Sequence, residues 1–319
     1  AGGRGWSRAL NHAALRVIAE KNVLGPPTGL GMMLAAPTIA AHGTEEQIAA
    51  FVPKILNGEH AWCQLFSEPG AGSDLAGLQC KAEQDGDEWV INGQKVWTSG
   101  ADNADWIFCL VRTDTSAPKH SGITFVLFKM DQPGVAVKPI KLISGLSPFC
   151  ETFFEDARAS RKNVIGQVND GWTVAKRLLQ YERTMIGGGS GGGQKSLSVA
   201  QVAKQYIGVN AGRLADTSLR DDVISHAMDD RAFGLTVKRN VEESQSTKAP
   251  SYVSSMFKLY GTEQNKKRYE LMLTAMGSQM LGWEGEGFDA DELTQTRAWL
   301  RTKANSIEGG TSEVQLNII

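Results

Sequence analysis

Two neighbouring segments, 65–74 (LFSEPGAGSD) and 91–100 (INGQKVWTSG), contain the residue types needed to bind a large, flat, polar ligand. The glycines of the first segment predict a loop whose backbone N–H groups can approach a ligand closely. Ser67 and Ser73 can donate hydrogen bonds to ring or phosphate oxygens. The second segment carries Trp97, whose indole offers a stacking face. Together the segments predict one binding site.

A carboxylate in an apolar setting is a second candidate for chemistry. At about 100° per residue, Glu182 falls on the apolar face of the helix predicted after Gly171. That face is formed by Trp172, Ala175, Leu178 and Leu179. Burial there would raise the pKa of Glu182 toward the range of a general base. The structural alternative is an ion pair with a core arginine, for example Arg183.

Two further motifs do not predict the chemistry that they resemble. Gly188–Gly192 matches GxSxG, in which Ser190 would be a nucleophile between a strand and a helix. A helix is predicted before it, so a loop between helices is favoured. Gly70-Ala71-Gly72 begins a GxGxxG pattern, but Leu75 replaces the third glycine and no βαβ unit surrounds it.

Composition predicts a soluble globular protein. The 319 residues are 41% hydrophobic, enough for a large core and more than one domain. A net charge of −2 excludes a basic field for nucleic acid or anionic lipid. The longest uncharged stretch, 23–41, is interrupted by prolines and predicts no membrane span. No CxxC or Cys/His spacing indicates a metal site or a disulfide framework, and reduced thiols are expected at Cys63, Cys80, Cys109 and Cys150.

Three zones must position these residues. The zone 6–58 is helical, and Thr44–Gln47 has the pattern of a capping box. The zone 61–166 contains short strands, two of which are predicted to meet at a hairpin turn at Asn92-Gly93. The expected strands are 89–91, 95–97, 106–112, 123–130, 135–139 and 151–154. Helices then return, and they are expected at 172–183, 197–214, 224–243, 252–277 and 291–306.

The order of motifs resembles that of the acyl-CoA dehydrogenases, a family of flavoenzymes. Besides the two opening segments, the likeness rests on GTEEQ at 43–47, NVIGQVNDGW at 163–172 and IEGGTSEVQLNII at 307–319. The resemblance implies an α+β fold: an N-terminal helical domain at 1–60, a middle β-barrel domain at 61–166 and a C-terminal four-helix bundle at 167–319. It also implies further helices before and after the present chain, bound FAD, and usually a homotetramer.

The resemblance assigns ligand contacts in the first half of the chain. Phe66 and Ser67 would contact the pyrimidine edge of the flavin. Trp97 would stack on its dimethylbenzene side, and Ser99 would bond near N5. The pyrophosphate and the pantetheine arm of the substrate would face Gly72 and Ser73.

Further contacts are implied in the second half. Arg183 is expected to bind substrate. Thr311 and Glu313 match positions that touch the adenosine half of FAD, and the loop from Gln279 to Gly282 resembles one that is lent by a neighbouring subunit. The usual pyrophosphate arginine is not well reproduced, because one residue too few separates Arg231 from Phe233.

The implied reaction requires a base that removes a proton next to a thioester while a hydride leaves the adjacent carbon. In the commonest family pattern the base precedes Gly-Thr, but Gly309 occupies that place and Glu308 lies one residue earlier. One residue rotates a side chain by roughly 100°, which would turn Glu308 away. A subset that includes isovaleryl-CoA dehydrogenase carries its base before an arginine in the earlier helix. Glu182 matches this placement and is the predicted base, with Glu308 second. The Gly309 N–H is predicted to donate to the thioester oxygen.

The predicted activity is therefore FAD-dependent α,β-dehydrogenation of an acyl-CoA to the trans-2-enoyl-CoA, with an electron-transferring flavoprotein as acceptor. A homotetramer or dimer is expected, in the bacterial cytoplasm or, in a eukaryote, the mitochondrial matrix. Two alternatives stay open: an acyl-CoA oxidase that uses O2, and a catalytically silent partner subunit, which the weak match at Arg231 motivates. The acyl chain is not predicted.

Overall fold

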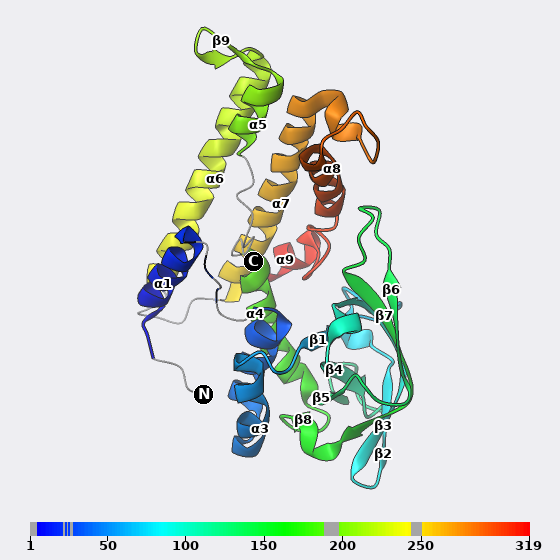
Figure 1. Ribbon diagram of the computed structural model, residues 1–319. Coiled ribbons are helices and arrows are strands. Elements are labelled where there is room, and N and C mark those ends of the chain that lie inside the picture. The colour runs from blue at the N-terminus through cyan, green and yellow to red at the C-terminus, as the bar shows by residue number, and fades with distance from the viewer. Residues whose placement is uncertain (1–4, 22, 24, 26–27, 188–197, 244–250) are drawn as a thin grey trace. The chain divides into compact units, whose positions relative to one another are not determined.

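The computed structural model describes residues 5–21, 23, 25, 28–187, 198–243 and 251–319 (Figure 1). Its contacts divide the chain into two compact units. Unit 1 comprises residues 1–6, 21–141 and 147–182, and unit 2 comprises 7–20, 142–146 and 183–319. Helices and a mixed sheet are both present, which confirms the predicted α+β class. The three domain boundaries given above stay a prediction.

Unit 1 is built on an eight-stranded sheet with the order β6-β7-β3-β2-β4-β5-β8, in which β1 also pairs with β4 (Figure 1). The sheet is mixed because β1 and β2 run parallel to β4, whereas the other neighbours are antiparallel. The strands are β1 (Trp62–Leu65), β2 (Lys81–Asp85), β3 (Glu88–Ser99), β4 (Trp106–Arg112), β5 (Ile123–Lys129), β6 (Val135–Ile140), β7 (Phe149–Ser160) and β8 (Val164–Ile165).

Alternation along the strands gives the sheet two apolar cores. One, the sheet core, is formed largely by strand residues and includes Cys63, Cys109 and Val126. The other, the helix-side core, joins the opposite strand face to helices and includes Phe108 and Phe125. Successive side chains of a strand point to opposite faces, so β4 and β5 contribute to both cores.

Four helical elements of unit 1 share the helix-side core. They are a π-helix η1 (Gly31–Ala35), α2 (Ala36–His42), α3 (Glu45–Leu56) and the first part of α4 (Gly171–Gly187). The predicted capping box is confirmed, because the side chains of Thr44 and Gln47 each accept a backbone N–H of the other residue. Gln47 also donates to the carbonyl oxygens of Lys162 and Val164, which fixes the start of α3 beside β8. Short 3-10 turns occur at η2 (Leu75–Gly77), η3 (Ala101–Asn103) and η4 (Arg161–Asn163).

Helices dominate unit 2. Its elements are α1 (Arg8–Glu20), α5 (Val199–Tyr206), α6 (Thr217–Glu243), α7 (Ser251–Met276), a 3-10 turn η5 (Gly277–Leu281), α8 (Ala290–Thr302) and α9 (Ser312–Ile318). Helix α7 is central, because it contacts α5, α6, α8 and α9. Met272, Ala275 and Val202 belong to the core of these helices. Helix α8 ends at Thr302, so the helix expected at 291–306 is shorter than predicted, and turns connect it to α9.

The predicted hairpin turn at Asn92-Gly93 is wrong. Strand β3 runs unbroken from Glu88 to Ser99, and the turn lies before it at Gly86, where φ is +59°. Gly93 instead marks a shift in the register between β3 and β7, with φ at +147°. A Cβ atom at Gly93 would lie 2.9 Å from the Cα atom of Cys80. Here Asn-Gly serves close backbone packing at a bulge, a second use of glycine in strands.

The helix predicted at 197–214 is also wrong beyond Tyr206. Helix α5 ends there, and a small hairpin of β9 (Val209–Asn210) and β10 (Arg213–Leu214) follows. Gly208 and Gly212 adopt left-handed φ values of +82° and +77°, which a continuing helix cannot contain. The GxSxG motif around Ser190 lies outside the described residues.

Candidate functional site

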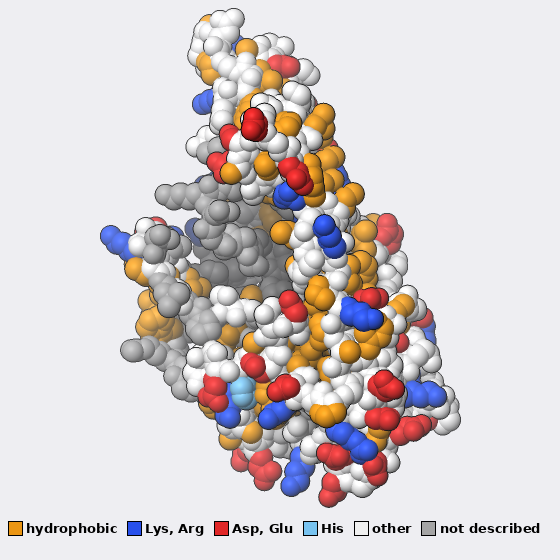
Figure 2. Space-filling view, turned by 45° about the vertical axis from the view of Figure 1, so that its right-hand side comes forward, with side chains coloured by type: hydrophobic (Ala, Val, Ile, Leu, Met, Phe, Trp, Pro, Cys, Tyr) orange, Lys and Arg blue, Asp and Glu red, His pale blue; other side chains and the backbone are white. Residues whose placement is uncertain are grey.

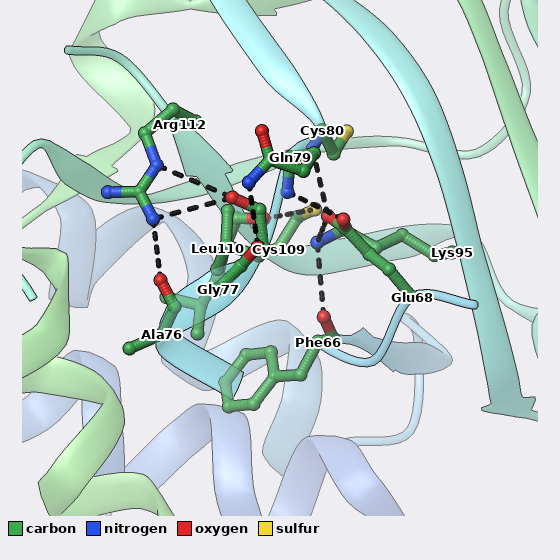
Figure 3. A network of polar contacts seen from close by, with 11 residues as sticks. Phe66, Glu68, Ala76, Gly77, Gln79, Cys80, Lys95, Cys109, Leu110 and Arg112 are labelled. Atoms are coloured by element: carbon green, nitrogen blue, oxygen red, sulfur yellow. Dashed lines mark hydrogen bonds and ion pairs between the residues drawn. The ribbon is translucent and has the colours of Figure 1, made fainter. Parts of the chain in front are cut away.

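A buried ion pair joins the two segments that the sequence predicts to bind a flat ligand (Figure 3). Lys95 of β3 is fully buried, and its Nζ lies 2.8 Å from Oε1 of Glu68 and 3.1 Å from the carbonyl oxygen of Phe66. The Glu68 carboxylate also accepts the backbone N–H groups of Gln79, at 2.6 Å, and Cys80, at 2.9 Å. The loop after β1 is therefore fixed to β3 through one carboxylate.

The charge of Lys95 depends on this pairing. Burial by itself lowers the pKa of Lys95, yet its net pKa lies above the usual value because neighbouring groups favour the cation. Burial also raises the pKa of Cys80 to about 11 and that of Cys109 well above its usual value. Both thiols are then neutral at pH 7, which leaves Glu68 as the anion that keeps Lys95 protonated.

Arg112, at the end of β4, holds the far end of the same loop (Figure 3). Its guanidinium donates to the carbonyl oxygens of Ala76, at 2.6 Å, and Leu78, at 3.4 Å. It also donates to the carbonyl oxygens of Lys119 and Ser121. Burial lowers the pKa of Arg112, which stays charged because the usual arginine value is so high. Between these two anchors, Gly72 and Ser73 are exposed, and a Cβ at Gly72 would meet nothing within 4 Å.

Trp97 lies on β3 in a left-handed conformation, with φ at +61°. The register between β3 and β7 shifts between Lys95 and Thr98, so Trp97 sits in a bulge. The residue is 56% exposed, and the ring centroids of Trp97 and Phe149 lie 6.1 Å apart in an edge-to-face arrangement. A bulky residue with this φ is uncommon, and such outliers concentrate at functional sites. The exposed indole face can therefore stack against a bound ring.

The loop and the strand lie side by side, because the Val96 N–H donates to the carbonyl oxygen of Ser67 at 2.9 Å. Ser67 and Ser99 are half-buried. The Phe66 ring lies in the helix-side core, in edge contact with Phe108 and Phe125. Hydroxyl donors, open glycines and a free indole face thus converge in unit 1. This donor set fits a flavin nucleotide, which needs a stacking surface and neutral polar contacts.

Glu182 is half-buried near the end of unit 1. Its Oε2 accepts a hydrogen bond from Nε2 of Gln64 at 2.9 Å. Gln64 belongs to β1, the strand that leads directly into the loop at Phe66 and Ser67. The candidate base and the first residues predicted to contact the flavin are therefore positioned by the same strand.

Glu308 lies in unit 2 and has two partners of its own. Arg301 donates to its Oε2 at 2.6 Å, and Asn305 donates to its Oε1 at 2.7 Å. Gly309 follows with φ at +62°, and no residue in the described part of the chain accepts its N–H. The adjacent Gly310 carbonyl accepts from Lys258 at 2.7 Å. Glu308 is thus a structural ion-pair partner, and Gly309 keeps its donor available.

The other predicted contacts of unit 2 are spread over several elements. Thr311 caps α9 by accepting the Val314 N–H at 3.2 Å, and Glu313 is exposed. Gln279 is half-buried in η5, whereas Gly282 is buried against Phe288. Arg183 is half-buried.

Arg231, the doubtful pyrophosphate ligand, is exposed on α6. Phe233 packs against Phe257 and Tyr260 of α7, and so belongs to the contact between the two helices. Among the described residues no cluster of His, Cys, Asp or Glu could hold a metal ion. None of the helices that the structure describes is long and apolar enough to cross a membrane. Acidic and basic side chains alternate over the face in Figure 2, without an extended patch of one sign.

Three residues of this site were missed by sequence reasoning: Gln64, Glu68 and Lys95. A signal existed for Lys95, because it lies an even number of residues from Trp89 and Ile91, which are buried on the same strand. A lysine at an inward position requires a partner. The partner itself could not be identified, since Glu68 lies 27 residues away in a loop.

Comparisons with known proteins agree along the chain. Residues 63–157 match the family described as acyl-CoA dehydrogenase, middle domain, and residues 169–319 match acyl-CoA dehydrogenase, C-terminal domain. The acyl-CoA dehydrogenase IpdE1 of Mycobacterium tuberculosis is 37% identical, over 100% of this chain and 80% of its own length.

Two further matches differ in extent. The acyl-CoA dehydrogenase FadE34 of the same organism is 36% identical over 99% of this chain, which spans only 42% of that relative. A solved structure, described as Tcur3481-Tcur3483 steroid ACAD, superposes with a TM-score of 0.85 and 26% identity. That superposition covers 99% of this chain and 81% of the other.

Proposed function

The chain belongs to the acyl-CoA dehydrogenase family, and from this premise we propose that it oxidises the α,β bond of an acyl-CoA thioester with Glu182 as the base. The observation that carries the assignment of the base is the difference between two carboxylates. Both oxygens of Glu308 are engaged by Arg301 and Asn305 in unit 2, whereas Glu182 accepts a hydrogen bond from Gln64 on the strand that leads into the proposed flavin-binding loop.

Unit 1 would hold the cofactor. Ser67 and Ser99 would donate to the ring system, Trp97 would stack on it, and the exposed Gly72 and Ser73 would contact phosphate oxygens. FAD, when bound, supplies the hydride acceptor of the reaction. The Lys95–Glu68 pair contributes indirectly, since it fixes the loop and the strand on which these groups stand.

The proton of the α-carbon would pass to the Glu182 carboxylate. Such proton transfer contributes about 10²–10⁴-fold to rate when the base is well placed. The negative charge that develops on the thioester oxygen needs a fixed donor, and we propose the N–H of Gly309, which no described residue accepts, for this role. Ser73 and Arg183 would bind parts of the CoA thioester away from the reacting carbons.

The substrate class that we propose is an acyl-CoA whose acyl group is attached to a polycyclic ring system. Support comes from the superposition with a steroid ACAD over 99% of this chain. A panel of thioesters tests this: a steroid side-chain CoA ester should reduce the flavin at least ~10-fold faster than isovaleryl-CoA or a straight-chain ester, which corresponds to about 1.4 kcal/mol of discrimination. Equal rates would contradict the proposed class.

An electron-transferring flavoprotein is the proposed acceptor. Oxygen uptake during turnover should be slow without such an acceptor, and fast uptake would indicate an oxidase.

The chain is proposed to form a homo-oligomer. The description of the similar steroid enzyme names two components, Tcur3481 and Tcur3483. Light scattering should therefore measure the molar mass of the purified chain alone and of its mixture with a second acyl-CoA dehydrogenase chain. A colourless protein that cannot take up FAD alone would favour the silent-subunit alternative.

Substitution of each glutamate tests the base. In anaerobic mixing with an acyl-CoA, Glu182→Gln should lower the rate of flavin bleaching by about 10²–10⁴-fold, because the amide cannot accept the α-proton. Glu308→Gln is the matched control and should bleach within about threefold of the parent rate, since it loses only an ion pair with Arg301. If Glu308→Gln abolishes bleaching and Glu182→Gln does not, the assignment of the base is wrong.

A further inference from the structure

We propose that Gln64 is a positioning residue for Glu182, which holds the carboxylate in the orientation required to receive the α-proton. The inference rests on the proposed function, because it takes Glu182 as the base. Its structural support is the hydrogen bond from Gln64 Nε2 to Glu182 Oε2 at 2.9 Å, between residues 118 positions apart in sequence.

The position of Gln64 in β1 is unusual for a glutamine. Its neighbours at alternate positions, Trp62 and Phe66, are 6% and 4% exposed and belong to the helix-side core. Gln64 pairs in the sheet with Phe108, another member of that core. An amide among aromatic side chains is unfavourable unless it finds a hydrogen-bond partner. A carboxylate is a strong acceptor for it, because hydrogen bonds to ionised groups are about twice as strong as neutral ones.

Both ends of this hydrogen bond stand on fixed elements. Strand β1 is paired along its whole length with β4, from Trp62 opposite Trp106 to Leu65 opposite Cys109. Helix α4 is fixed in its rotation by Ala175 and Leu178, both 0% exposed in the helix-side core. Side chains on strands and helices hold a reacting group more accurately than side chains on loops.

The chemical type of the donor also suits a base. A guanidinium in direct contact with a carboxylate stabilises its charged form, and this weakens the carboxylate as a proton acceptor. The Gln64 amide is uncharged. It can fix the orientation of Glu182 at a smaller loss of basicity than an arginine would cause.

The experiment separates positioning from packing with Gln64→Met. Methionine has nearly the same length and volume and fits an apolar face, but it cannot donate. In anaerobic stopped-flow mixing, normalised to bound flavin, the limiting rate of flavin reduction should fall by about 10- to 100-fold, because the base is no longer held in place. The apparent dissociation constant for acyl-CoA should change less than ~3-fold, and the isotope effect with α-deuterated substrate should rise, since proton abstraction becomes slower.

Two further variants complete the design. Gln64→Asn keeps an amide on a side chain one methylene shorter and should show the same loss of limiting rate, whether or not Gln64→Met folds well. Gln84→Met is the matched control, because Gln84 is an exposed glutamine of β2 whose amide donates to the Gly86 carbonyl, at 3.3 Å, away from Glu182. It should keep the parent rate.

The outcomes for the two proposals can be distinguished. If Glu182→Gln still bleaches the flavin at the parent rate, the proposed base is wrong and Gln64 has no such role. If Glu182→Gln is inactive but both Gln64→Met and Gln64→Asn keep the parent limiting rate and isotope effect, Glu182 remains the base and the positioning role of Gln64 is overturned. A change confined to the dissociation constant would also overturn it.

Discussion

Backbone strain and side-chain exposure coincide at Trp97. The left-handed conformation costs a non-glycine residue roughly 1–2 kcal/mol. Burial of the side chain does not offset this cost, because Trp97 is 56% exposed. Strand β3 contains another tryptophan, Trp89, which is only 5% exposed in the sheet core. The two residues therefore allow packing and ligand stacking to be separated on one strand.

Trp97→Gly should leave the apo-protein almost as stable as the parent. Relief of the left-handed strain opposes the entropy that glycine adds to the unfolded chain, so the free energy of unfolding should change by less than about 1 kcal/mol. FAD affinity should fall about tenfold or more, because the stacking surface is lost. Urea unfolding and FAD titration measure the two effects. Trp89→Ala, the control, should lose about 3–5 kcal/mol. An equal loss of stability in Trp97→Gly would identify Trp97 as a core residue.

The connection between β3 and the loop after β1 depends on charges in a dry environment. The Lys95 and Glu68 side chains are 0% and 7% exposed. Removal of one partner leaves a buried charge, which typically costs about 3–5 kcal/mol. Glu68 additionally accepts two backbone N–H groups, so an apolar residue at this position would leave those donors unsatisfied.

Lys95→Met should therefore destabilise the apo-protein by about 3–5 kcal/mol and release FAD, because the loop and the strand are no longer fixed to each other. The double variant Lys95→Met/Glu68→Gln should recover at least about half of this loss, since the Gln carbonyl can still accept one of the two backbone N–H groups and no charge remains. Denaturant unfolding in a double-mutant cycle measures the coupling. Additive effects of the two substitutions on the free energy of unfolding would show that Lys95 and Glu68 do not stabilise the fold as a pair.

Local patterns predicted the capping box and segments of β3 to β7, because helix caps and alternation are short-range features, but they did not predict β1, β2 or β8. The segment 106–112 was predicted residue for residue as β4, and Thr44–Gln47 as a cap. Asn92-Gly93 was misread, since the choice between a turn and a bulge depends on Cys80 across the sheet. The Gln64–Glu182 contact could not be predicted, because residues 118 positions apart meet only after the sheet and α4 have packed together.

At the scale of the whole molecule, the family resemblance predicted more than any single pattern. It predicted the α+β class and the order of the helical and sheet zones, and the family comparisons over 63–157 and 169–319 agree. Tertiary contacts grouped the chain differently, with α2 and α3 in the same unit as the sheet and α1 in unit 2. Helix and strand patterns in the sequence could not predict this grouping, because the units are defined by tertiary contacts and not by the type of element.

The stability of unit 2 should depend on pH through His226. Burial lowers the pKa of this imidazole on α6, although the nearby charge of Asp230 opposes the effect. The folded state therefore favours the neutral ring. Its contribution to stability is present above the unfolded value of about 6.5 and is lost as the pH falls through the lower folded pKa.

His226→Gln should accordingly flatten the acid limb of the stability profile. Between pH 7.5 and pH 5, the parent should lose more free energy of unfolding than the variant, because only the parent takes up this proton on unfolding. Thermal and urea unfolding across this range measure the difference. His120, exposed in the turn before β5, supplies the control: His120→Gln should leave the slope of the profile unchanged. Parallel profiles for parent and His226→Gln would contradict the assignment.

The four cysteines give the protein a set of internal reporters. Cys63, Cys80, Cys109 and Cys150 are all free and between 0% and 2% exposed. Thiolate is the reactive form, and burial keeps each of them protonated and covered. A thiol reagent can thus react with the folded chain only when the sheet opens, so the labelling rate counts those openings. The same shielding means that a fluorophore can be attached at one introduced surface cysteine without first removing the native ones.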